Sequence, residues 1–262
     1  VEQGPATERH VAPHQVADRC RRGRQTRVTA SHCPVAFPGK PTGSVAGPHR
    51  LRVSAHRRNI RIGELPGKSP APAGFDDGIV IDERLLITRD ASGPKSAKMV
   101  LQNPRVDFAV LEVARGGILR EGLGYDRNDI AVVTNIQSDH LGMRGINSLE
   151  DLANVKQVIV EAVPRDGFAV LNADDEYVRR MRRVCRGTIV WFSMEPPGSA
   201  VREFIDERCR RGARAVVLEP SDRGEMIVLK QGRRSMPLAW THLLPSTFGG
   251  AARMNVANAL AA

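Results

Sequence analysis

The amino-acid sequence predicts an α/β fold, a mainly parallel sheet with flanking helices, preceded by a disordered basic leader. Two apolar runs rich in Val and Ile, DFAVLEV (107–113) and DIAVVTNI (129–136), are typical of strands buried on both faces of such a sheet. After them, strand-like runs alternate with helical segments of roughly 10–16 residues, as right-handed β–α–β crossovers require.

The basic character of the chain lies in its first part. Residues 1–75 hold 13 Lys and Arg against 4 Asp and Glu, a net charge of +9, whereas all 262 residues carry +10. This segment also holds 9 of the 17 prolines and 5 of the 7 histidines, and its scattered apolar residues are too sparse to offset the entropy of ordering a backbone. We therefore expect a disordered Arg/Pro/His-rich leader over 1–75 and a folded domain over 76–262. The Arg-rich stretch 19–27 lacks the interleaved aromatics of a nucleic-acid module, so nucleic acid is an unlikely partner.

The first folded elements can be assigned in order. Residues 78–88 predict a short hairpin. Ser92 is a candidate helix cap, and Pro94 opens a helix that continues to about Asn103. The two buried strands follow, separated by RGGILREGLGYDR (115–127).

A clear amphipathic helix is predicted over 148–163. Ser148 and Asp151 resemble a capping arrangement at its start, and its apolar residues recur on one face. The remaining predicted elements are strands in 167–175, 187–193 and 213–220, helices in 174–185 and 201–212, a hairpin in 225–240 that turns at 231–232, and a helix after Gly249-Gly250.

The cysteines and the apolar runs bound the cellular context. The four cysteines form neither a CxxC pair nor a zinc-binding spacing, and no run approaches the 18 or so apolar residues of a membrane span. We expect a reduced, cytoplasmic protein without a membrane partner.

Two ionisable residues follow the two buried strands. Glu112 is the only charge between Phe108 and Ala114, and Asp139 and His140 follow the second strand. Because ligands of open α/β sheets bind beyond the carboxyl ends of strands, Glu112 and His140 are candidate metal ligands. The alternatives are a Glu112 satisfied by backbone amides or by Arg115, and a His140 that is merely a surface residue.

Lys156 lies on the apolar stripe of the helix over 148–163. A lysine there can bury its stem and extend its amine into water. Alternatively, a desolvated amine is partly neutral and can add carbon dioxide, which converts it into an oxygen ligand suited to Mg²⁺. Arg115 lies three residues after Glu112, and its planar guanidinium could bind an anion through two hydrogen bonds. The glycines that follow, Gly116-Gly117, permit either a close backbone approach or a tight turn.

The strings LEVARGGILREGLGYDR, VVTNIQSDHLG, LANVKQVIVEAV and LNADDE resemble the central ATPase domain of the Mur ligase family. The resemblance covers roughly 76–262 and is closest to a branch that adds arginine to a poly-aspartate backbone. It implies an ATP-dependent carboxylate–amine ligase, which phosphorylates a carboxylate and lets an amine attack the acyl phosphate. The implied partners are ATP, arginine and the poly-aspartate chain, and the full-length protein could be a homo-oligomer.

The resemblance also implies residue roles. Glu112 and His140 match the family's Mg²⁺ ligands, and Lys156 matches a lysine that many members carbamylate. Arg115 joins Lys156 as a candidate catalytic residue. Asn255 and Asn258 match paired asparagines near the adenine of ATP, where an amide can serve both as donor and as acceptor.

One part of the family pattern is missing. The chain has no GxxGK[ST] loop to cradle the phosphates; the nearest string, GELPGKSP (63–70), has altered spacing, no apolar strand before it and prolines after its lysine. Since losing one preorganised donor costs about 3–4 kcal/mol, we expect the chain to be inactive alone.

Both ends look cut, since the chain opens with Val and stops at Ala262 within an apparent helix, before the family's third domain. We therefore expect a fragment. A further hypothesis is that residues 1–75 are an out-of-frame translation, because their composition is what GC-rich codons yield in another frame. The functional alternatives are a noncatalytic degenerate nucleotide fold whose basic tail binds RNA or an acidic polymer, and another Mur-like ligase such as a folate-type glutamate adder.

Overall fold

The computed structural model describes residues 27–31, 59–62, 78–81, 84–87, 90–104, 106, 108–138, 141–142 and 145–262. Within these residues the strands form one 11-stranded sheet in the order β11-β10-β9-β8-β7-β6-β1-β5-β2-β3-β4. The strands are β1 (Arg27–Ser31), β2 (Asn59–Ile62), β3 (Ile79–Ile81), β4 (Arg84–Ile87), β5 (Phe108–Glu112), β6 (Ile130–Val133), β7 (Phe168–Asn172), β8 (Thr188–Ser193), β9 (Arg214–Ser221), β10 (Gly224–Gln231) and β11 (Arg234–Trp240).

The centre of the sheet is parallel and its two margins are antiparallel. Strands β2, β5, β1, β6, β7, β8 and β9 pair in parallel, whereas β3 and β4 at one margin and β10 and β11 at the other are antiparallel. The predicted mainly parallel α/β sheet is therefore confirmed.

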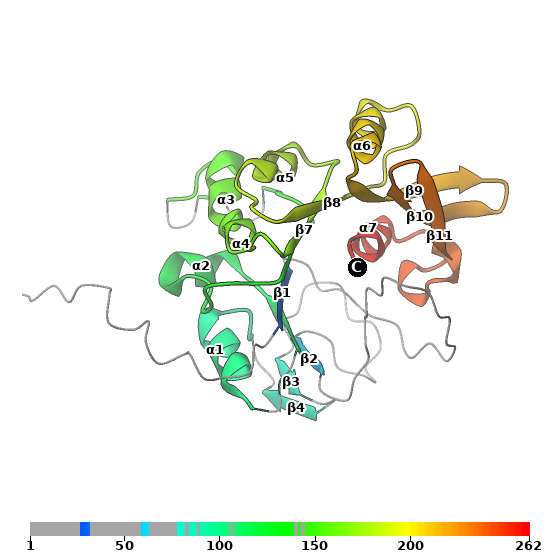
Figure 1. Ribbon diagram of the computed structural model, residues 1–262. Coiled ribbons are helices and arrows are strands. Elements are labelled where there is room, and N and C mark those ends of the chain that lie inside the picture. Colours follow the sequence, from blue (N-terminus) through cyan, green and yellow to red (C-terminus); the bar gives the residue numbers. More distant parts are fainter. Residues whose placement is uncertain are drawn as a thin grey trace, which may run out of the picture.

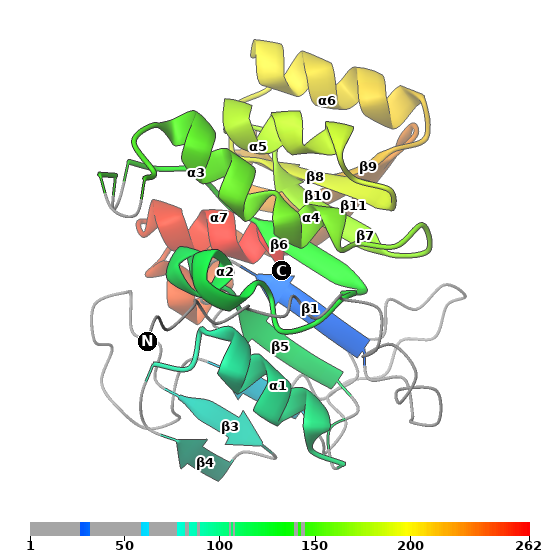
Figure 2. The same cartoon turned by 90° about the vertical axis from the view of Figure 1, so that its left-hand side faces the viewer.

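Helices cover both faces of the sheet. They are α1 (Pro94–Gln102), α2 (Arg115–Glu121), α3 (Leu149–Lys156), α4 (Val158–Glu161), α5 (Glu176–Arg180), α6 (Ala200–Arg210) and α7 (Arg253–Ala261), with 3-10 turns η2 (Met181–Arg183), η3 (Thr241–Leu243) and η4 (Pro245–Thr247). Figure 1 shows the sheet nearly edge-on, with α1 to α5 on one side and α7 on the other. Figure 2, turned by 90°, shows α1 to α6 in front of the strands.

The hydrophobic core is divided by the sheet. Ala131 and Val133 of β6 belong to the cluster that packs under α3 to α6, whereas Val132 between them belongs to the cluster under α7. This alternation follows from the two-residue period of a strand, and it explains why β6 reads as a continuous apolar run.

Several predicted local features are confirmed. The hairpin in 78–88 is β3–β4, and the hairpin in 225–240 is β10–β11. Ser148 caps α3, because its hydroxyl accepts a hydrogen bond from the Asp151 amide while the Asp151 carboxylate accepts from the Ser148 amide.

Two strands come from residues 1–75, where the sequence predicts no regular structure. β1 lies between β5 and β6 and pairs in parallel with both, and β2 lies on the other side of β5. Backbone pairing with neighbouring strands satisfies N–H and C=O groups whatever the side-chain pattern, so the absence of an apolar period did not exclude a strand. The rest of 1–75 lies outside the described residues, and the expected disorder and out-of-frame origin of the leader stay predictions.

The segment between the two buried strands is also more regular than expected. Residues 115–121 form α2, a helix, and Gly122 with φ of 73° ends it in the manner of a glycine C-terminal cap. Gly117 permits a close approach, since a Cβ built there would lie 2.9 Å from Cδ of Pro94. The close-approach interpretation of Gly116-Gly117 is therefore correct for Gly117, and the tight-turn interpretation is wrong.

Two helix boundaries differ from the prediction. Ser92 does not cap α1, because its hydroxyl donates to the Asp90 carboxylate at 2.7 Å and the capping position is Gly93. The helix predicted over 148–163 is interrupted at Gln157, where the carbonyl oxygen accepts from Val160 three residues on. The β-branched run Val158-Ile159-Val160 crowds this turn, which accounts for the tighter pattern.

Candidate functional site

The strand order creates a switch point at the carboxyl edge of the parallel strands. β5 and β6 are consecutive parallel strands along the chain, yet β1 lies between them, with Ser31 paired both to Glu112 of β5 and to Val132 of β6. Two strand spacings separate β5 from β6, or about 10 Å. Open α/β sheets bind ligands beyond the carboxyl ends of their parallel strands, near such a change in strand order.

Glu112 and Arg115 lie together at this edge. Glu112 is the last residue of β5, and Arg115 is the first residue of α2, three positions later. Both side chains are half-buried, and both are engaged by polar or electrostatic contacts. The prediction that a carboxylate is delivered to the carboxyl edge of the sheet is thus confirmed for Glu112. His140, with Asp139, lies outside the described residues, so its position beside Glu112 stays a prediction.

Lys156 is buried, as its place on the apolar stripe predicts. It is the last residue of α3, its exposed fraction is 6%, and it is engaged by a polar or electrostatic contact. This fraction is that of the whole residue, so the snorkelling and carbamylation interpretations of its amine both stay predictions.

Asn255 and Asn258 lie on the opposite face of the sheet. They belong to α7, which packs on β7, β8 and β9 and begins at the carboxyl edge, where Arg253 pairs with Glu225 of β10. The Asn255 side-chain nitrogen donates to the Ser246 carbonyl oxygen at 2.6 Å, which fixes the orientation of the amide. The structure therefore places Glu112 and Arg115 at the same edge of the sheet, and it places the two asparagines apart from them, across the sheet.

A set of braces that the sequence analysis missed holds the loops at this edge. The Asn172 amide donates to the Thr134 carbonyl oxygen at 2.8 Å, and the Asp175 carboxylate accepts from the Ile136 amide at 2.7 Å. In the next loop, the Asp174 carboxylate accepts from the Met194 amide at 2.8 Å and from the Ser193 hydroxyl. The signal was present in LNADDE, where polar residues directly follow a buried strand and precede a helix. These bonds position the loop that leads from β6 toward residue 140.

Thr134 is a second missed residue at this edge. It follows the last residue of β6, is buried, and its hydroxyl oxygen has no hydrogen-bond partner among the described residues. A buried hydroxyl without a partner is destabilising by about 1–3 kcal/mol. Its place beside β1, at the end of β6, puts an unused oxygen at the switch point.

The donor types at this edge fit a hard cation. Glu112 and Thr134 offer oxygen, and Mg²⁺ prefers carboxylate, hydroxyl and water oxygens. Among the residues that the structure describes, no three His, Cys, Asp or Glu side chains gather closely enough to hold a metal by themselves. A metal site here would therefore need His140, another residue outside the described ranges, or oxygen atoms of a bound substrate.

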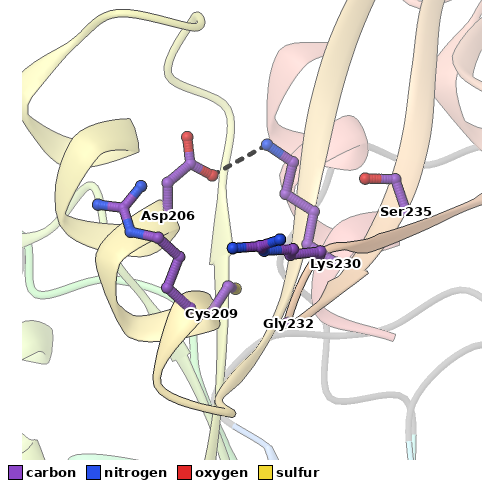
Figure 3. A pocket seen from close by; sticks show the side chains of 7 residues that line it. Asp206, Cys209, Lys230, Gly232 and Ser235 are labelled. Carbon is purple, nitrogen blue, oxygen red and sulfur yellow. Dashed lines mark hydrogen bonds and ion pairs between the residues drawn. The ribbon is translucent and has the colours of Figure 1, made fainter.

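Another hollow of about 350 Å³ lies away from this edge, between α6 and the β10–β11 hairpin (Figure 3). Lys230 crosses it to Asp206 at 2.9 Å and also reaches Glu219 at 3.2 Å, so its charge is neutralised within the fold. Burial raises the pKa of the Cys209 thiol, which favours the neutral thiol over the thiolate nucleophile. We assign no chemistry to this hollow.

Across the described part of the chain, no helix has the length and apolar character needed to cross a membrane.

Comparison with known proteins gives a consistent family relationship. The Mur ligase middle domain matches residues 87–262. The cyanophycin synthetases of Crocosphaera subtropica and Trichormus variabilis are 37% and 36% identical over 271 and 277 residues, and both matches cover 100% of this chain. The chain spans 29% and 28% of the length of these relatives. These matches confirm the resemblance carried by the motifs in 76–262.

Solved structures give a weaker likeness. The S73A mutant of L. casei FPGS is 14% identical with a TM-score of 0.42, covering 92% of this chain and 64% of that chain. This likeness adds nothing to the relationship seen in the sequences.

Proposed function

The chain belongs to the Mur ligase family, and on that premise we propose that it contributes the nucleotide-binding domain of an ATP-dependent ligase that adds arginine to a poly-aspartate backbone. The observation that carries the proposal is the 37% identity to a cyanophycin synthetase along the entire chain. The carboxyl edge beside β1 supports it, because Glu112 ends β5, Arg115 begins α2 and Thr134 follows β6 there, at the edge where α/β sheets bind phosphorylated ligands.

In the proposed reaction, a carboxylate oxygen of the aspartate side chain attacks the γ-phosphorus of ATP, and ADP leaves. The arginine amine then attacks the acyl carbon, phosphate leaves, and the amine loses a proton as the amide forms. Both steps develop negative charge on phosphate or carbonyl oxygens, so positioned cations and donors are the main contribution of the protein.

The residues at the carboxyl edge take distinct roles in this proposal. Glu112 and His140 would hold Mg²⁺, which when bound draws the phosphate oxygens together and neutralises their charge. Arg115, the first residue of α2, orients the reacting carboxylate or phosphate through its planar fork. Lys156 would add carbon dioxide through the neutral form of its amine, which loses a proton as the N–C bond forms, and the carbamate would supply a further oxygen.

The nucleotide base belongs on the other face. Asn255 and Asn258 lie on α7, and the Asn255 amide is already held in one orientation by Ser246. A fixed amide can discriminate the donor and acceptor positions of adenine. ATP would then extend over the carboxyl edge, from α7 on one face to the switch point beside β1.

The chain lacks the glycine-rich loop that would bind the ATP phosphates. No GxxGK[ST] string occurs in the 262 residues. A strand does precede GELPGKSP, contrary to the sequence prediction, because β2 ends at Ile62. However, β2 lies outside β5, whereas β1 occupies the slot at the switch point, and residues 63–70 lie outside the described ranges. We therefore propose that the chain binds Mg-ATP but forms no ADP by itself.

Calorimetric titration of the chain with Mg-ATP tests the proposal. Binding heat is expected for the native chain and is expected to disappear in Glu112→Ala and in His140→Ala. Glu121→Ala is the matched control, because Glu121 is an exposed carboxylate at the end of α2, paired with Lys95 at 3.6 Å, and its loss should leave the heat unchanged. An unchanged titration in Glu112→Ala contradicts the metal role. Salt-sensitive RNA binding that is lost on deleting residues 1–75, without any ATP heat, favours the noncatalytic alternative instead.

A further inference from the structure

The 3-10 turn η2, which follows α5, and helix α6 bring two arginines onto one aromatic ring. The guanidinium carbon of Arg182 lies 5.7 Å from the centre of the Phe204 ring, and that of Arg208 lies 5.3 Å from it. The edge of the same ring is occupied by Trp191, whose ring centre is 5.3 Å away at an interplanar angle of 79°. Two like charges are thus held close together by a shared contact.

These charges are not neutralised within the described part of the chain. No carboxylate there lies within ion-pair distance of Arg182 or Arg208, whereas neighbouring arginines are paired: Arg210 and Arg211 both contact Glu207 at 2.7 Å. The pKa of Arg182 is lowered by burial first and then by repulsion from Arg208, Arg183 and Arg179. In the folded protein, this cluster therefore has unfavourable electrostatics that a bound anion would relieve.

A hollow of about 290 Å³ lies beside the cluster. It is lined by Arg179, Arg182, Ala200, Val201 and Phe204, so it has cationic walls and an apolar floor. Figure 2 shows α5 and α6 next to each other on one face of the sheet. The part of α6 that lines this groove, Ala200 to Phe204, is about 6 Å long, and Arg208 does not line it but lies one turn further along, over the Phe204 ring.

The groove leads to the carboxyl edge of the sheet. Arg179 donates to the Ala173 carbonyl oxygen at 2.5 Å, and Ala173 directly follows β7 at that edge. Arg179 therefore links the hollow to the proposed reaction edge, and Arg182 and Arg208 contact the Phe204 ring that lines it.

We propose that this groove binds the carboxylates of an acidic polypeptide, with Arg182 and Arg208 as its anchoring cations. An arginine fork matches a carboxylate in bidentate geometry, and aspartates on alternate residues of an extended chain recur about every 6.8 Å on one side. Nucleic acid fits less well, because Phe204 is engaged by two guanidiniums and by Trp191 and is not available as a platform for bases. That this polypeptide is the poly-aspartate substrate rests on the proposed function. Binding of acidic polypeptides by the groove does not depend on that function.

Fluorescence anisotropy of a labelled aspartate oligomer, about ten residues long, titrated with the 262-residue chain in about 0.1 M salt tests the proposal. Arg182→Gln with Arg208→Gln is expected to weaken binding about ten-fold or more. Arg210→Gln with Arg211→Gln is the matched control, which removes the same two charges from arginines that both pair with Glu207, and is expected to change affinity less than about two-fold. Equal losses in the two double variants overturn the proposal, because binding would then follow net charge alone.

Two further measurements complete the test. The glutamine pair should melt at the same temperature as the native chain or higher, since repulsion is removed. Arg182→Lys with Arg208→Lys keeps the charges but lacks the planar forks, and should recover only part of the affinity. Full recovery with lysine, or tighter binding of an RNA oligomer of equal charge, overturns the proposal. Aspartate-oligomer binding that persists where Mg-ATP binding is absent supports the groove and refutes only the proposed function.

Discussion

The Asp175 carboxylate accepts a hydrogen bond at 2.7 Å from the amide of Ile136, a residue 39 positions earlier in the chain. Its other oxygen accepts from the Val178 amide at 3.0 Å and so caps α5. One side chain thus fixes both the start of a helix and the loop that leaves β6 toward His140.

Asp175→Ala should lower the free energy of unfolding by about 2–3 kcal/mol, because it removes a helix cap and a charge-assisted hydrogen bond together. Urea unfolding followed by circular dichroism measures the loss. Asp166→Ala is the control, since Asp166 is a surface carboxylate paired with Arg127 at 3.2 Å and should contribute less than about 1 kcal/mol. Equal effects of the two substitutions would show that the brace carries no stability.

Gly116 and Gly117 should respond in opposite directions to alanine. Both lie in the first turn of α2, where alanine is favoured over glycine by about 1 kcal/mol. A Cβ at Gly116 meets nothing within 4 Å, so Gly116→Ala should stabilise the chain. A Cβ at Gly117 lies 2.9 Å from Cδ of Pro94, and the overpacking should leave Gly117→Ala destabilised by about 1–2 kcal/mol. Thermal melting of both variants measures these effects. If both substitutions shift the melting temperature in the same direction, the close contact between α1 and α2 is refuted.

The capping box of α3 predicts an acid-sensitive contribution to stability. The pKa of Asp151 is lowered first by the hydrogen bond with the Ser148 side chain and then by that from the Asn147 amide. A carboxyl group whose folded pKa is depressed stabilises the fold above its unfolded pKa, about 3.9, and this contribution is lost as the pH falls through the lower folded value. Asp151→Asn should therefore reduce the melting temperature at pH 7 and flatten its decline below about pH 4. A parallel decline in native and variant chains contradicts this.

Arg202 should be among the most sensitive positions in the second half of the chain. Its side chain is 1% exposed, donates to the Leu218 carbonyl oxygen at 2.8 Å, and pairs with Glu219 at 2.6 Å. Breaking a buried ion pair by removing one partner is strongly destabilising, so Arg202→Ala should cost about 3–5 kcal/mol in urea unfolding. Arg202→Met, which keeps most of the volume, should cost less. Arg210→Ala, on the exposed end of α6, should change the free energy by less than about 1 kcal/mol. A loss of less than about 1 kcal/mol for Arg202→Ala would contradict the structural role of this side chain.

The strand and helix order of residues 76–262 could be predicted because each strand is a short apolar run bounded by turns. The helical spacing of apolar residues also identified the buried side of α3, on which Lys156 lies. No helix was predicted at the Gly-rich start of α2 because glycine is a poor helix former, although Arg115, Ile118, Leu119 and Arg120 favour one. β1 could not be predicted, because its strand pairing depends on neighbours 80 and 100 residues away along the chain.

The candidate site was predictable only in part. Glu112 could be placed at the sheet edge because it ends an apolar run. The orphan hydroxyl of Thr134 and the braces of Asp174 and Asp175 depend on which loops meet in space, and nothing local in the sequence gives that. Arg202 lies on the buried face of α6 with Ile205 and Cys209, and a charge there is stabilised only by the carbonyls and the carboxylate that surround it.

The position of β1 between β5 and β6 makes the chain vulnerable to aggregation while it folds. Before residues 27–31 insert, β5 and β6 each present an unpaired backbone edge, and the sheet consists of two separate pieces. Closing that gap joins segments distant in sequence and is therefore slow compared with the formation of local helices. During this interval an open edge can recruit the same strand from a second molecule, so this gap in the sheet is where intermolecular pairing would begin.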